Sequence, residues 1–200
     1  MKATTIPLKI NKPTPSREQA KEAVKTILEY IGEDPKREGL LMTPDRVIDS
    51  FGELYAGYEL CPGEQLKTRF VEMSEFEDII LLKAINFNSV CEHHMLPIKG
   101  LVDVAYIPKG SVVGISKIAR VVDIYSRRLQ IQERMTAEIA QALYKHLKPY
   151  GVAVRVSASH SCMEMRGVLK ENSALDSFYY SGNFREDIEL RQEFVKLISK

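Results

Sequence analysis

The 200-residue chain is predicted to fold as an α+β protein with helices on one face of an antiparallel sheet. Three observations predict this class. Residues 101–107 and 152–159 each alternate apolar side chains, as half-buried strands do. Between them, apolar residues recur at helical spacing over residues 118–125 and 132–147. From residue 79 onward the predicted order is therefore strand, strand, helix, helix, strand, strand.

The amino-terminal part is predicted to contain an extended arm and two helices. The arm covers residues 1–16. Ser16 and Gln19 have the pattern of a capping box, and the apolar residues that follow recur at helical spacing. Thr43, with Pro44 at the first helical position, begins the second helix. We expect these two helices to pack together.

The remaining elements follow from the same periodicities and from the turn residues between them. They are strands over residues 79–87, 101–107 and 112–113, a helix with Ser116 as its N-cap, a helix over residues 132–147, strands over residues 152–159 and 162–169, and a closing helix over residues 186–198. Residues 162–169 either pair with the preceding strand or continue it. We expect residues 1–75 to form an arm and helical segment and residues 76–200 to form the main domain of one structural unit.

The composition argues against several classes of protein. A hydrophobic content of 44% lets a chain of 200 residues bury one core. A net charge of +1 gives no overall positive field, so we expect no nucleic-acid partner. The sequence has neither a signal-peptide segment nor a run of about 18 apolar residues, so we expect no membrane partner. Three cysteines, two of them in metal-like spacing, fit a reducing compartment and predict a cytoplasmic protein.

Two short clusters carry the residue types that bind zinc, namely Cys91 with His94 and His160 with Cys162. A tight loop can turn Cys91 and His94 toward one ion. If residues 155–165 are extended, His160 and Cys162 project from the same face of a strand. The surplus of histidines favours a catalytic site with Cys91, His94 and Cys162 as three ligands. Two alternatives stay open, which are buried unreactive residues and a closed structural site that also takes His160.

His93 and His160 are candidates for proton transfer beside such a metal. An imidazole with a pKa near 6.5 can pass protons to and from a nucleophile or a nitrogen leaving group. The alternatives are a solvated loop residue for His93 and a core histidine with satisfied hydrogen bonds for His160. Glu92 either supports a neighbouring ligand or is a surface charge.

A basic stretch is a candidate phosphate site. Ser116, Lys117 and Arg120 lie near the start of a predicted helix, where backbone N–H groups and the helix dipole also favour an anion. Arg127–Arg128 extends the basic stretch, and Arg166 adds a guanidinium that could close on the same phosphate. The alternative is a solvated basic face paired with nearby carboxylates.

Gln132 and Glu133 offer a different kind of recognition. A carboxylate acceptor beside an amide can hold the N–H and carbonyl edge of a purine. Alone, this dipeptide is no evidence of a purine substrate.

These residues lie in segments that resemble the GTP cyclohydrolase I family. The matching segments include Cys91-Glu92-His93-His94, and in chain order they are residues 32–40, 43–47, 91–94, 105–108, 114–120, 128–134 and 159–168. The resemblance is collinear over roughly residues 16 to 198, which makes it far more specific than any single motif.

The resemblance implies a tunnelling fold, in which β-β-α-α-β-β units assemble into rings and two stacked pentamers form a homodecamer with active sites between subunits. It implies one Zn2+ ion per subunit, held by Cys91, His94 and Cys162, with His93 and His160 near the reacting purine. GTP would be hydrolysed at C8, with release of formate and rearrangement to 7,8-dihydroneopterin triphosphate in tetrahydrofolate or pterin biosynthesis. The residues implied in substrate binding are Gln132 and Glu133 for guanine, and Ser116, Lys117, Arg120, Arg166 and Arg46 for ribose and triphosphate.

The chain departs from the family pattern at several positions. Asp49 stands where some members carry a lysine, and Lys99, Leu101 and Asp103 are unusual after the Cys91 loop. Residues 173–180 replace a segment normally rich in Thr and Val. The competing hypotheses are a related tunnelling-fold enzyme that acts on another purine or pterin, and a non-catalytic zinc-stabilised ring that binds a nucleotide.

Overall fold

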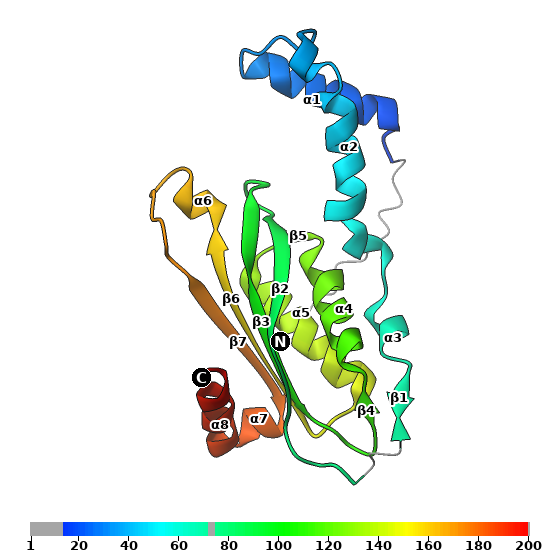
Figure 1. The fold of residues 1–200 in the computed structure, drawn as a ribbon, viewed down its shortest axis with the longest axis vertical. Coiled ribbons are helices and arrows are strands. Elements are labelled where there is room, and N and C mark those ends of the chain that lie inside the picture. Colours follow the sequence, from blue (N-terminus) through cyan, green and yellow to red (C-terminus); the bar gives the residue numbers. More distant parts are fainter. Residues whose placement is uncertain (1–13, 72–74, 200) are drawn as a thin grey trace.

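The computed structural model describes residues 14–71 and 75–199 (Figure 1). The predicted arm, at residues 1–16, therefore lies almost entirely outside the described residues. None of the helices in the described ranges combines the length and apolar character that a membrane span requires.

One five-stranded sheet forms the centre of the molecule, with strand order β5-β2-β3-β6-β7. The antiparallel strands are β2 (Ile80–Cys91), β3 (Pro97–Ile107), β6 (Gly151–His160) and β7 (Leu175–Gly182). Strand β5 (Leu129–Gln130) pairs in parallel with the end of β2, and β1 (Arg69–Phe70) pairs with β4 (Val112–Val113) in a separate two-stranded sheet. With α4 (Ile115–Ser126) and α5 (Gln132–Leu147), the chain has the β-β-α-α-β-β order of a tunnelling fold, as predicted.

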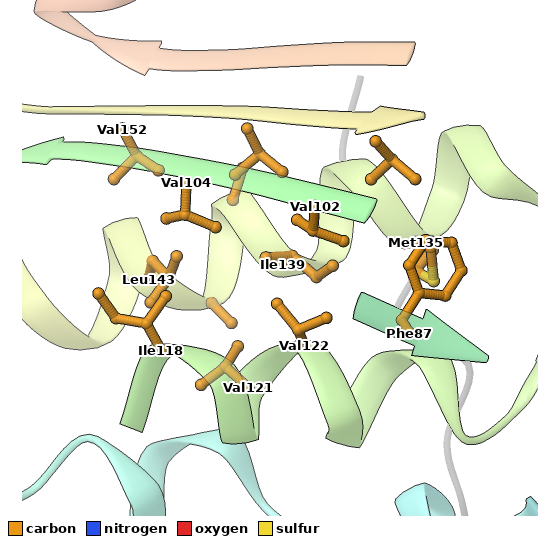
Figure 2. Close-up of a cluster of buried hydrophobic side chains, with 14 of the residues drawn as sticks. Phe87, Val102, Val104, Ile118, Val121, Val122, Met135, Ile139, Leu143 and Val152 are labelled. Carbon is orange, nitrogen blue, oxygen red and sulfur yellow. The ribbon is translucent and has the colours of Figure 1, made fainter. Parts of the chain in front are cut away.

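The main core lies between the sheet and helices α4 and α5 (Figure 2). Val102, Val104 and Val152 point from the strands toward Ile139 and Val122 on the helices, and all five side chains are fully buried. Each such side chain contributes about 1.5 to 3 kcal/mol through its burial, so this layer holds the sheet against the two helices.

The opposite face of the sheet is partly covered too. Ala105 and Ala153 alternate with the core valines and contact a second buried cluster that contains Phe184 and Phe194. These phenylalanines come from α7 (Asn183–Glu186) and α8 (Ile188–Ile198). The prediction of helices on one face therefore holds for α4 and α5, whereas the carboxyl-terminal helices lie on the other face (Figure 1).

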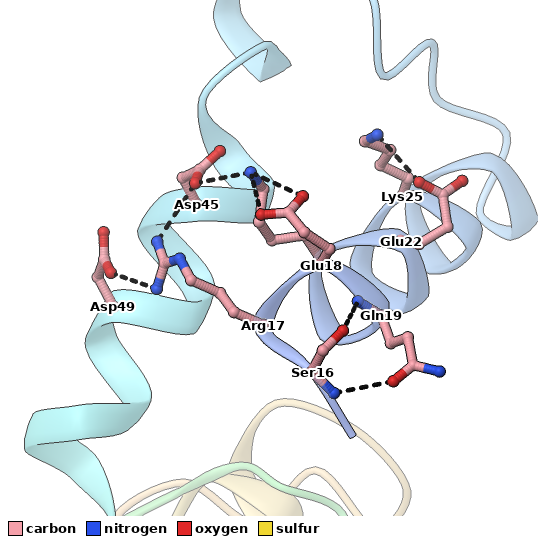
Figure 3. A network of polar contacts seen from close by, with 9 residues as sticks. Ser16, Arg17, Glu18, Gln19, Glu22, Lys25, Asp45 and Asp49 are labelled. Carbon is pink, nitrogen blue, oxygen red and sulfur yellow. Dashed lines mark hydrogen bonds and ion pairs between the residues drawn. The ribbon is translucent and has the colours of Figure 1, made fainter. Parts of the chain in front are cut away.

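The amino-terminal helices are α1 (Arg17–Tyr30) and α2 (Thr43–Leu54), with the short helix η1 (Glu38–Leu40) between them. Two short elements follow α2, namely η2 (Ala56–Glu59) and α3 (Pro62–Gln65). The predicted capping box at Ser16 is present. Arg17 pairs with Asp49 at 2.8 Å and with Asp45 at 3.2 Å, which joins α1 to α2 (Figure 3). Asp49 therefore has a structural partner in this chain.

Several predicted boundaries are wrong. The strands predicted over residues 79–87 and 101–107 extend further toward the turn between them, over residues 80–91 and 97–107. Ser116 is not an N-cap, because Gly114 occupies that position and its carbonyl accepts a hydrogen bond from Lys117 N at 2.9 Å. The strand predicted over residues 162–169 does not form, since residues 161–164 are helical and Gly167 has a φ of +67°. The last strand is instead β7. Likewise, the closing helix α8 begins at Ile188 and not at residue 186, because Asp187 caps it and Glu186 ends the separate helix α7.

Candidate metal centre and active site

The structure brings together the three residues predicted as metal ligands. One ligand atom from each of Cys91, His94 and Cys162 lies within 4.8 Å of the others. Cys91 Sγ is 3.8 Å from His94 Nδ1. Two ligands bound to zinc at about 2.3 and 2.0 Å in tetrahedral geometry would be roughly 3.5 Å apart. The donor set and its spacing therefore fit a zinc ion.

The register of the sheet explains why these distant residues converge. The hairpin between β2 and β3 turns tightly, with Cys91 N donating to Leu96 O at 2.8 Å and Met95 at a φ of 54°. Along β3, Ile98 is paired with His160 of β6. The end of β6 therefore lies beside the hairpin turn that carries Cys91.

Cys162 reaches the cluster in a different way from the one predicted. Strand β6 ends at His160, and Cys162 lies in the four-residue helix α6 (Ser161–Glu164). His160 and Cys162 are thus not on one face of a strand. Because the chain turns at Ser161, the thiol of Cys162 meets Cys91 while the imidazole of His160 takes another direction, toward Gln132.

The two thiols affect each other. Burial raises the pKa of the Cys162 thiol, and the nearby Cys91 raises it further. Two adjacent thiolates repel each other, so the neighbouring Cys91 adds to the effect of burial and favours the protonated form of Cys162. A bound divalent cation reverses that preference, because it stabilises coordinated thiolates directly.

An arginine that the sequence did not single out holds the Cys91 turn in place. Arg134 pairs with Glu92, and both side chains are about 30% exposed. Arg134 also donates to Leu129 O and to Gln130 Oε1, both at 3.0 Å. Glu92 therefore supports the turn between two ligands and is not a free surface charge. Only the charge complementarity of Glu92 and Arg134 could have indicated this contact from the sequence.

The two candidate proton-transfer histidines have different environments. The His93 side chain is 63% exposed and its ring lies edge-on to that of His94, with 6.2 Å between the centroids. His160 is half-buried, and its Nε2 lies 2.8 Å from Gln132 Oε1. Burial lowers the pKa of His160, while the charges of Glu133 and Glu164 partly oppose this shift. Glu133 therefore lies near His160, and it is exposed to solvent. A group that binds substrate must be accessible in this way.

Gln132 does not have the environment that its predicted role requires. The residue is only 1% exposed, and its amide is engaged with other protein groups. In this arrangement it has no side-chain surface to present to a purine.

A model of the GTP cyclohydrolase I family matches residues 20–199. The chain belongs to the GTP cyclohydrolase I family. A GTP cyclohydrolase 1 of Rickettsia prowazekii (strain Madrid E) is 55% identical over 186 residues, which are 93% of this chain and 98% of the relative. A GTP cyclohydrolase 1 of Rickettsia typhi (strain ATCC VR-144 / Wilmington) is 54% identical over 191 residues, which are 96% of this chain and all of the relative.

Solved structures that match the chain include the archaeosine synthase QueF-Like in its apo form, with 23% identity and a TM-score of 0.44 over 52% of this chain and 93% of that chain. An E. coli dihydroneopterin aldolase in complex with neopterin matches with 15% identity and a TM-score of 0.42, over 52% of this chain and 99% of that chain.

In this chain, the basic residues predicted for the triphosphate lie in separate places. Arg166 is at the metal cluster, with Nη1 3.1 Å from His94 Nε2. Ser116, Lys117 and Arg120 lie at the start of α4, whereas the end of α4 leads to β5 beside Cys91. At about 1.5 Å per residue, Lys117 is roughly 14 Å along the helix from Ser126.

Two further arginines have distinct surroundings. Arg46 is exposed on α2, in the amino-terminal helical segment. Arg128 is buried, and its guanidinium donates to the carbonyls of Gly57 and Ile124. The interpretation of Arg128 as part of a phosphate site is therefore wrong, because its donors are used inside the protein.

Proposed function

We propose that this member of the family is a zinc-dependent GTP cyclohydrolase I, which opens the purine of GTP at C8, releases C8 as formate and forms 7,8-dihydroneopterin triphosphate. The observation that carries the proposal is the convergence of Cys91, His94 and Cys162 in a chain of this family. Zinc, when bound there, supplies Lewis acidity and lowers the pKa of water.

The histidines of the chain would move the protons that ring opening requires. His160 would protonate N7 of the purine, so that charge building on the ring is neutralised as it opens. His93, with its exposed ring, would serve the later steps in which the ribose rearranges and the pterin ring closes. Glu133, near His160, would accept hydrogen bonds from the N–H edge of guanine, and Arg166 would bind a phosphate.

The remaining phosphate-binding residues would come from a neighbouring copy of the chain. The basic residues at the start of α4, which are Ser116, Lys117 and Arg120, lie at the end of the helix that is far from the metal cluster of their own chain. One chain therefore cannot easily place these residues and its metal cluster around the same GTP. Strand β2 pairs with β5 only at Val90 and Cys91, so within residues 14–71 and 75–199 most of one edge of the sheet has no partner strand. Joining such edges closes a ring. We infer a homodecamer of two stacked pentamers with one zinc ion per subunit.

A closed structural zinc site is less consistent with the geometry. Such a site would need a fourth protein ligand, and the sequence offers His160 for it. The Nε2 of His160 is instead bonded to Gln132, and His160 is not part of the ligand cluster among the described residues. Three protein ligands are the number typical of catalytic zinc.

The experiment compares the wild-type protein with Cys162→Ser and with Cys61→Ser. Each protein is incubated with GTP while formate and a fluorescent pterin are measured, and its bound metal is determined in the same sample. We expect Cys162→Ser to lose zinc and formate release, whereas Cys61→Ser retains both because Cys61 is an exposed thiol outside the cluster. Retention of zinc and formate release by Cys162→Ser would disprove the assignment.

A further inference from the structure

The side-chain amide of Gln132 connects three elements of the fold. Gln132 is the first residue of α5 and is only 1% exposed. Its Nε2 donates to Val156 O on β6 at 3.0 Å and to Leu175 O on β7 at 2.8 Å, and it lies 3.0 Å from Ser177 Oγ. Its Oε1 lies 2.8 Å from Nε2 of His160.

The two carbonyls determine the orientation of this amide. Val156 O and Leu175 O can only accept hydrogen bonds, so the NH2 group of Gln132 must face them. Flipping the amide would place Oε1 against both carbonyl oxygens and would leave buried acceptors unpaired, at a cost of about 1 to 3 kcal/mol each. The oxygen is therefore fixed toward His160.

This orientation determines which nitrogen of His160 carries hydrogen. An amide oxygen only accepts, so the short contact requires an N–H at Nε2 of His160. In a neutral imidazole the other nitrogen is then an acceptor, and the hydrogen bond at one nitrogen sets the role of the other. Nδ1 of His160 has no hydrogen-bond partner among residues 14–71 and 75–199.

We propose that Gln132 is a positioning residue of the active site, which holds His160 with its hydrogen on Nε2 and so makes Nδ1 the nitrogen that exchanges protons with the substrate. The inference rests on the proposed function of His160 and deepens it. When Nδ1 takes up a proton, the Nε2–H bond to Gln132 Oε1 remains in place. The same bond then stabilises the imidazolium and keeps the ring oriented for the return of the proton.

The network continues into β7. Thr136 Oγ1 donates to Gln132 O at 2.7 Å and also lies 2.7 Å from Ser177 Oγ. Leu175 and Ser177 belong to the segment of residues 173–180 that departs from the family pattern. The backbone of that segment therefore contributes to the orientation of a proton-transfer group, although no side chain in it is a candidate for catalysis.

The first test measures the tautomer directly. Wild-type protein with its metal bound is labelled with 15N-histidine and studied by solid-state NMR near neutral pH, and His160→Asn identifies the His160 signals among those of the four histidines. We expect hydrogen on Nε2 and none on Nδ1 for the neutral ring. Hydrogen on Nδ1 would overturn the proposal, and this measurement requires no folded Gln132 variant.

The second test compares Gln132→Leu with Ser177→Ala. Both remove hydrogen bonds from the same buried network, but only Gln132→Leu removes the acceptor of His160. We expect Gln132→Leu to lower kcat about 10- to 100-fold with KM for GTP little changed, as for other residues that orient an active-site imidazole. Its His160 spectrum should show a mixture of tautomers. Ser177→Ala should retain the wild-type tautomer and kcat within about threefold.

Other outcomes of these two tests would contradict the positioning role of Gln132. Equal losses of kcat in both variants, with an unchanged His160 spectrum, would show a merely structural role for Gln132. A rise in KM alone for Gln132→Leu would show that the amide contacts guanine after all. If wild-type protein released no formate from GTP, the proposed function would fail, whereas a wild-type enzyme with hydrogen on Nδ1 would refute this inference alone.

Discussion

Replacing Arg128 with methionine should destabilise the protein without weakening GTP binding. Arg128 is 9% exposed, and its Nη2 and Nε donate to Gly57 O at 2.8 and 3.1 Å. Nε also donates to Ile124 O at 2.9 Å. The guanidinium carbon lies 4.8 Å from the centre of the Tyr125 ring. Arg128 thus ties η2 to the end of α4.

The expected loss in the free energy of unfolding follows from these contacts. Arg128→Met leaves the carbonyls of Gly57 and Ile124 without their donor, at about 1 to 3 kcal/mol each. Loss of the cation–π contact adds about 1 kcal/mol. Methionine keeps much of the apolar packing and introduces no unpaired charge. The total is about 3 to 7 kcal/mol, and at about 2 to 4 °C per kcal/mol for a domain of this size Tm should fall by roughly 6 to 28 °C.

The assay is thermal unfolding at one fixed protein concentration, because the Tm of an oligomer depends on concentration. Arg127→Met is the matched control, since it makes the same change at the adjacent, exposed arginine. We expect Arg127→Met to melt close to the wild-type temperature. If Arg128→Met kept the wild-type Tm within about 2 °C and instead raised KM for GTP tenfold, Arg128 would be a phosphate ligand and the argument would be refuted.

Three further predictions test other parts of the structure. Arg134→Leu should weaken zinc retention about 10- to 100-fold in a chelator titration, because the Cys91 turn loses its anchor, whereas Arg127→Leu should not. Gly100→Ala should prevent soluble expression, since its Cβ would lie 2.1 Å from a backbone oxygen of β6, whereas Gly52→Ala in α2 meets nothing within 4 Å and should raise Tm slightly. Burial, followed by nearby positive charges, lowers the pKa of His146, so the unfolded chain binds more protons below about pH 6.5. Stability should therefore fall between about pH 7 and pH 5, and unfolding measured across that range should show a smaller fall in His146→Gln.

The ligand cluster could be predicted from the sequence because it depends on residue type and short spacing. Cys91 and His94 share one turn, so their proximity is a local property of the chain. The placement of Cys162 beside them depends on the pairing of β3 with β6. The alternating pattern of residues 152–159 predicted the strand β6 but not its partner. The core of the fold could be predicted for the same reason, since the apolar periodicities of α4, α5 and β6 are regular.

The errors arose where tertiary contacts decide the conformation. Residues 162–169 contain enough apolar side chains to suggest a strand, but the chain turns at α6 so that Cys162 reaches the metal cluster. The role of Gln132 in guanine binding stays a prediction, but its contacts within the fold could not be predicted from the sequence. Its partners include Leu175 O, 43 residues away along the chain. Every residue type has a backbone carbonyl, so the sequence does not indicate which carbonyl will accept this hydrogen bond.

Binding of a metal ion to this cluster would be thermodynamically linked to formation of the sheet. Cys91 and His94 belong to the β2–β3 hairpin, whereas Cys162 follows β6, and the two groups meet only when Ile98 pairs with His160. An ion bound to all three ligands therefore stabilises that register and has much lower affinity for any state in which β6 is detached. The same register places the ring of His160 against Gln132, so the pairing that completes the candidate ligand set also orients His160. If the proposed function is correct, loss of the register would abolish metal binding and proton transfer together, even though different residues would provide them.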